Sequence, residues 1–65
     1  MVEAKDLYDE ITVENIVCQI ADGWESPHVI AEHIVGTDVW RTLPEWDKVI
    51  IKARVHKMIR DNKLL

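Results

Sequence analysis

The basic side chains in the last third of the chain are the residues best suited to a binding chemistry. Seven side chains could contact phosphates from a single helix: Lys48, Lys52, Arg54, His56, Lys57, Arg60 and Lys63. Each phosphate that a cation neutralises releases counterions and adds to the affinity for DNA. The N-terminal turns of such a helix enter the major groove, so Lys48, Lys52 and Arg54 are the best candidates for direct contacts. Alternatively, the cations only solvate an outer face and form pairs such as Lys57 with Asp61.

The charge of the chain is divided along its length. Residues 1–40 carry nine acidic side chains against one basic side chain, and residues 41–65 carry seven basic against three acidic, within a net charge of −4. A nucleic-acid-binding protein keeps its positive charge on one element in this way, whereas the acidic total opposes binding. Binding to DNA therefore requires the acidic half to point outward. A further option is that the acidic face imitates the charge of DNA.

The other candidates for catalysis or metal binding are a cysteine and the histidines of the segment HVIAEH. His28 and His33 are five residues apart, which separates them by about 140° around a helix, so they cannot share an ion. The segment matches neither of the zinc motifs that it approaches. Cys18 lies in an apolar stripe, where we expect a buried and inert thiol. We therefore expect no catalytic residue, no metal and no cofactor.

Three tryptophans and no phenylalanine occur in the chain. Trp24 continues the apolar stripe of a predicted helix, so we expect it in the core. Trp40 and Trp46 lie in or beside a segment of irregular pattern. Tryptophan is enriched at binding hot spots, so these two residues are candidates to anchor a partner protein or a second copy of the chain.

Capping residues and glycines predict two helices in the first half of the chain. Residues 11–23 have Thr12 as the N-terminal cap and Gly23 as a left-handed stop. Their apolar residues follow helical spacing and form one stripe: Val13, Ile16, Val17, Ile20 and Trp24. Residues 26–36 begin with Ser26 as cap and Pro27 in the first turn, and they end at Gly36.

The second half of the chain predicts a loop followed by a long helix. In residues 37–44 the apolar side chains show no helical spacing and Pro44 favours extended geometry before it, so a loop with a short strand is expected. Thr42 and Glu45 are spaced as a capping box that begins the helix, and Asn62 ends it in left-handed geometry. Its apolar side is formed by a set that faces the core: Ile51, Val55, Met58 and Ile59. Residues 1–10 are expected to form a mobile or loosely docked arm.

Two segments resemble the winged helix-turn-helix domains of bacterial, archaeal and phage regulators. The segment IVCQIADGWESPHVIAEHIVG is similar to the first two helices of that family, and IKARVHKMIRDNKLL is similar to its recognition helix. The resemblance covers Ile11 to Leu65 and implies a mostly α fold, in which residues 11–65 form a three-helix core with at most a short β element. The family's wing begins where the chain ends, so we expect an incomplete wing and carry over no wing contacts to DNA.

These observations lead to one principal function and one alternative. The principal prediction is a small regulator that binds duplex DNA through the predicted long helix, as a homodimer because one short helix offers little contact area. The alternative is a protein-interaction module of the same fold, an inhibitor or an assembly subunit. No uncharged stretch approaches the ~20 residues of a membrane span and no signal peptide is recognised, so we expect a cytoplasmic protein. No small-molecule substrate is expected.

Overall fold

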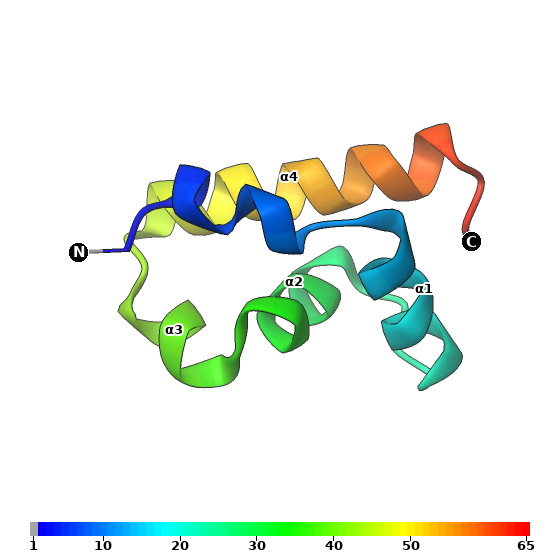
Figure 1. The fold of residues 1–65 in the computed structure, drawn as a ribbon, viewed down its shortest axis with the longest axis horizontal. Helices are drawn as coiled ribbons and strands as arrows, with labels where there is room; N and C mark the ends of the chain where they lie inside the picture. The colour runs from blue at the N-terminus through cyan, green and yellow to red at the C-terminus, as the bar shows by residue number, and fades with distance from the viewer. Residues whose placement is uncertain (1) are drawn as a thin grey trace.

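The computed structural model describes residues 2–65, which form four α-helices and one 3₁₀ helix (Figure 1). In chain order the elements are η1 (Ala4–Glu10), α1 (Val13–Ala21), α2 (Pro27–Val35), α3 (Thr37–Thr42) and α4 (Glu45–Asp61). Within these residues there is no strand. The predicted mostly α, helix-turn-helix-like fold class is therefore confirmed.

The start and end of α1 are set by two local signals that the sequence contains. The backbone N–H of Asn15 donates to Thr12 Oγ1 at 3.1 Å, which satisfies one of the free donors at the N-terminus. Gly23, with φ of +100°, follows the last turn. Ile16 is fully buried, but Trp24 is 41% exposed, so its predicted core position is wrong. The reason is that α1 ends at Ala21, and Trp24 lies beyond the helical register that would have pointed it inward.

Helix α2 begins at Pro27 and stops at Val35, with Gly36 as the residue that ends it, as predicted. Pro27 occupies the first turn, where its missing N–H leaves no hydrogen bond unmade. Gly36 has φ of +96°, a conformation that L-residues with a side chain rarely adopt. Ser26 is the N-cap residue, as predicted, although its side chain accepts no capping hydrogen bond.

Residues 37–42 are helical, and the predicted loop with a short strand is wrong. Trp40, within α3, and Leu43, the extended residue that follows it, are both buried. The influence of Pro44 is confined to its neighbour Leu43, which is extended and ends α3. This short polar-rich helix thus packs against the core through Trp40, and the chain continues into the core with Leu43 directly after it.

The predicted capping box at the start of α4 is also wrong. The Thr42 hydroxyl donates to the carbonyl oxygen of Val39 at 2.8 Å, and the N-cap of α4 is Pro44, with no side-chain capping bond. At the other end, Asn62 follows the helix as expected, but its φ is −102°. Its side-chain amide donates to the Met58 carbonyl at 2.9 Å, and Lys63 takes the positive φ of 52°.

The core lies between α4 and the three elements that cover its inner side. Ile51, Val55 and Ile59 are buried at intervals of four residues, which confirms the predicted inner side of this helix. They pack with α2, whose Ile30 is fully buried, and with Ile16 of α1. These contacts fix α4 by one side and leave most of its remaining surface exposed.

Residues 4–10 form part of this core, which corrects the expectation of a loosely docked arm. Ala4 and Leu7 are buried, and η1 packs against the N-terminal half of α4 (Figure 1). The Ala4 backbone N–H also donates to the Asp47 carboxylate of α4 at 3.3 Å. The sequence did not predict this docking, because Ala4 and Leu7 are only two apolar residues three positions apart, which is too short a pattern to indicate packing. Met1, the first residue of the expected arm, lies outside the described residues.

Candidate nucleic-acid interface

Three basic side chains and one histidine recur at intervals of four residues along one side of α4. We call this set the cationic row: Lys48, Lys52, His56 and Arg60. Because four residues span about 400° of an α-helix, each member is displaced by only about 40° from the last. Lys52, His56 and Arg60 are exposed, and the side chain of Lys48 is 24% exposed. The long helix therefore presents a continuous positive edge.

The cationic row borders two hollows between α4 and the start of α2. The larger, of about 450 Å³, has His56, Arg60 and Lys63 on its α4 side and Pro27 and Glu25 on the other. The smaller, of about 170 Å³, has Lys48 and Lys52 opposite His28 and lies next to the buried Trp40. Lys63 thus joins the row at its C-terminal end.

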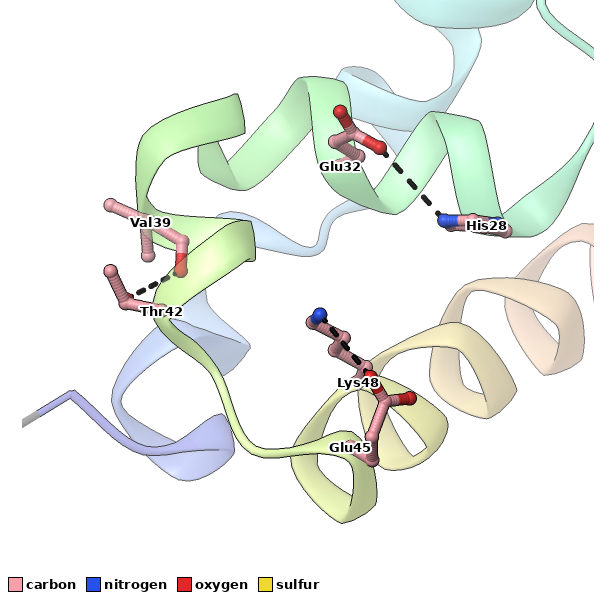
Figure 2. Close-up of polar contacts among 6 residues, drawn as sticks. All are labelled: His28, Glu32, Val39, Thr42, Glu45 and Lys48. Atoms are coloured by element: carbon pink, nitrogen blue, oxygen red, sulfur yellow. Dashed lines mark hydrogen bonds and ion pairs between the residues drawn. The ribbon is translucent and has the colours of Figure 1, made fainter.

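Acidic residues next to the row make only exposed or loosely packed contacts. Lys48 Nζ lies 3.5 Å from a carboxylate oxygen of Glu45, on the side of α4 that faces α2 (Figure 2). On α2, His28 Nε2 lies 3.8 Å from Glu32 (Figure 2). Pairs of this kind contribute little to stability and exchange readily with other partners. They leave Lys48 and His28 able to accept a phosphate group as a new partner.

Two of the predicted DNA-binding residues lie outside the row. Arg54 is only two residues from Lys52, but that spacing turns it about 160° away, and its guanidinium lies 4.2 Å from the centroid of the Tyr8 ring. Lys57 is exposed and points away from the core, about 140° from Lys52. Of the seven predicted residues, four form the row and Lys63 lies at its C-terminal end. Arg54 lies on the opposite flank, and Lys57 lies beside the C-terminal end of the row, about 60° from Arg60.

The acidic element η1 occupies the flank of α4 opposite to the row. Its contacts to α4 are made through Arg54 and Asp47, both of which lie on that flank. Glu3, at its N-cap, and three acids within the helix add negative charge there: Asp6, Asp9 and Glu10. Packing thus separates part of the acidic half of the sequence from the basic row.

The three tryptophans differ from their predicted roles in two cases of three. Trp40 is 5% exposed and its ring stacks on His28, with 5.6 Å between ring centroids, so it is a core residue and not an exposed anchor for a partner. Trp24 contacts the ring of His33 at the surface, with 4.6 Å between centroids. Trp46 is 71% exposed on α4, which keeps it as a candidate for partner binding.

A second apolar side of α4 was missed by the sequence reasoning. We call it the outer stripe: Trp46, Val49, Ile50 and Ala53. Trp46, Val49 and Ala53 are exposed and Ile50 is half-buried. The members follow the spacing i, i+3, i+4, i+7 and so share one face. This spacing was visible in the sequence, but only one apolar side was assigned to the helix, and Trp46 was grouped with Trp40 as lying in or beside the preceding irregular segment.

The described residues contain no group of three or more histidine, cysteine or acidic side chains that could hold a metal ion. His28 and His33 contact different tryptophan rings, Trp40 and Trp24. Cys18 is exposed, which corrects the expectation of a buried thiol. The nine-residue helix α1 turns Ile16 inward and leaves Cys18, two residues later, on its outer side.

No protein-family model matches this chain, and neither does any curated protein or solved structure. In residues 2–65, none of the helices combines the length and the apolar character needed to cross a membrane.

Proposed function

We propose that the chain binds duplex DNA through the cationic row, as a small cytoplasmic regulator that acts by binding and not by catalysis. The observation that carries the proposal is the spacing of Lys48, Lys52, His56 and Arg60 on one exposed edge of the longest helix. The resemblance of this helix to the recognition helix of winged helix-turn-helix regulators supports the same conclusion.

The dimensions of α4 suit a duplex. An α-helix fits the major groove, which is about 12 Å wide. At a rise of about 1.5 Å per residue, the row extends for about 18 Å from Lys48 to Arg60. Lysine and arginine neutralise phosphates, and the His56 ring can donate a hydrogen bond to a phosphate oxygen. Each neutralised phosphate strengthens binding by counterion release.

The net charge of −4 does not oppose this mode of binding as strongly as the total suggests. The acids of η1 lie across the width of α4 from the row, a helix diameter of about 10–12 Å. At an ionic strength of 0.1 M the Debye length is about 10 Å, so exposed charges at that separation are largely screened. The DNA therefore experiences the nearby cations more strongly than the distant acids.

The experiment compares two variants that each lose one positive charge. Lys52→Gln alters the row, and Lys5→Gln alters the exposed side of η1. Binding of a fluorescein-labelled duplex is measured by anisotropy at low and moderate salt. We expect the unmodified chain to bind more weakly as salt rises, Lys52→Gln to weaken binding and lower the salt slope by about one, and Lys5→Gln to match the unmodified chain. Absence of binding at low salt, or equal losses in the two variants, contradicts the proposal.

A second candidate function is that of a protein-interaction module, favoured by the exposure of the outer stripe. Trp46 is 71% and Val49 51% exposed on the same face of α4. An exposed tryptophan in an apolar patch is typical of a binding hot spot. If the duplex titration shows no binding while Trp46→Ala loses a defined protein complex that Lys52→Gln retains, this candidate replaces the first.

A further inference from the structure

We infer that the outer stripe is an interface for a second copy of the chain, with the two α4 helices antiparallel about a two-fold axis at Ala53. The stripe is an apolar face on a helix whose opposite side already fills the core. Trp46 and Val49 are among the most exposed large apolar side chains of the described residues. A contiguous exposed apolar face on so small a domain is typical of an interaction surface, and association stabilises a domain with a small core.

Ala53 is the position at which the two helices can approach most closely. It is the smallest member of the stripe and is exposed, so it opposes its own copy without a steric clash. Trp46 lies seven residues before it and Arg60 seven residues after it, about 10.5 Å in each direction. In an antiparallel pair Trp46 is therefore level with Arg60 of the second copy, where a guanidinium can lie over the indole ring.

The charges at the two ends of α4 select this orientation. The first turn carries two acids, Glu45 and Asp47, against Lys48, whereas the last turns carry Lys57 and Arg60 against Asp61. An antiparallel pair brings the acidic end of each helix beside the basic end of the other, and a parallel pair would bring like charges together. The present contacts of Glu45 and Arg60, to Lys48 and to Asp61, are both exposed at 3.5 Å, so they do not prevent new pairing. This complementarity identifies the occupant as a second copy.

The pairing has a consequence for DNA binding that rests on the proposed function. Lys48 and Lys52, at the N-terminal end of the cationic row, lie about 100–140° around α4 from Ala53, whereas Arg60 lies nearly in line with the outer stripe. A two-fold axis perpendicular to both helices keeps each row on the same face of the dimer, and it keeps both η1 elements on the opposite face. The dimer would offer a duplex Lys48 and Lys52 of both copies on one face, while each Arg60 is engaged at the interface. Doubling the contacts in this way is what a small helix requires for useful affinity.

Sedimentation equilibrium without DNA tests the pairing. We expect a mass that rises to twice the 7.6 kDa of the chain as the concentration approaches the millimolar range. Ala53→Glu, at an exposed position, is expected to stay monomeric with an unchanged helical circular dichroism spectrum. A monomer at millimolar concentration, or a dimer that survives Ala53→Glu, overturns the inference.

A charge exchange tests the antiparallel register. Glu45→Arg and Arg60→Glu each place like charges side by side twice in the dimer, so each is expected to raise the dissociation constant about tenfold. The double variant restores the pairing in reversed order and is expected to recover most of the loss. Two losses that simply add would exclude this register. Lys52→Gln is expected to remain dimeric, so a dimer that binds no duplex refutes the proposed function alone, and a monomer that binds duplex refutes the pairing alone.

Discussion

The guanidinium of Arg54 lies over the ring of Tyr8, with 4.2 Å between Arg54 Cζ and the ring centroid. The contact joins α4 to η1 on the flank that faces away from the cationic row. Lys52, two residues earlier, borders the hollow on the other side of the same helix. Two neighbouring cations that the sequence treats alike thus have different surroundings.

Arg54→Ala is expected to lower the free energy of unfolding by about 0.5–1 kcal/mol, because it removes a cation–π contact at the surface. The same change is expected to weaken duplex binding less than Lys52→Ala does. Urea unfolding followed by circular dichroism gives the first quantity, and the anisotropy titration gives the second. Equal losses of duplex affinity in the two variants, with unchanged stability in Arg54→Ala, would contradict the separation of roles.

A second prediction compares two threonines that the sequence assigned to the same task. Thr12 accepts a hydrogen bond from the Asn15 backbone N–H, so Thr12→Ala is expected to cost about 1 kcal/mol of stability. Thr42 caps no helix, and its hydroxyl only donates to a carbonyl within α3, so Thr42→Ala is expected to stay within about 0.5 kcal/mol. The urea unfolding midpoints of the two variants test this prediction. A larger loss of stability in Thr42→Ala than in Thr12→Ala would contradict it and would indicate that Thr42 caps a helix.

The elements that the sequence predicted correctly are those marked by short-range chemistry. Thr12 and Gly23 mark the two ends of α1, and Pro27 and Gly36 mark those of α2. They were predictable because a cap, a missing N–H and a positive φ each act within one turn. The inner side of α4 was also predictable, since a period of four residues over a long helix leaves few alternatives.

The features that escaped prediction depend on contacts between distant parts of the chain. Trp40 is buried because α3 packs against α2, and the pattern of the neighbouring residues does not predict that packing. Arg54 leaves the candidate site because η1 docks on its flank of α4. For the candidate site, the sequence therefore supplied the positive helix, and tertiary packing selected which of its cations share an edge.

A third prediction concerns an acid that borders the row. Glu25 lies across the larger hollow from His56 and Arg60, where its charge repels an approaching phosphate. Glu25→Gln is expected to strengthen duplex binding about twofold at low salt, with the gain shrinking as salt rises. Glu3→Gln is the matched control, because Glu3 lies at the start of η1 on the opposite flank, and it is expected to change the affinity less. Equal gains would mean that only the net charge matters.

The last prediction separates Trp40 from Trp46, two residues that the sequence grouped as candidate anchors. Trp40 is 5% exposed, and replacing a buried aromatic side chain by alanine costs about 3–5 kcal/mol. A chain of this length has a total stability of about 3–10 kcal/mol, so Trp40→Ala is expected to be largely unfolded or close to it. Trp46 is 71% exposed and supports no core contact, so Trp46→Ala is expected to unfold within about 0.5 kcal/mol of the unmodified chain.

The role of Trp46 can be tested by measuring self-association, since its removal is expected to leave the stability of the monomer unchanged. Because Trp46 lies in the outer stripe, Trp46→Ala is expected to raise the dissociation constant of the dimer while its unfolding midpoint, measured in dilute monomer, stays the same. Val2→Ala is a suitable control, since Val2 is an exposed apolar residue that precedes η1 and lies outside the stripe. A Trp46→Ala chain that associates as tightly as the control would remove Trp46 from the interface, and a Trp40→Ala chain of undiminished stability would contradict the packing of α3.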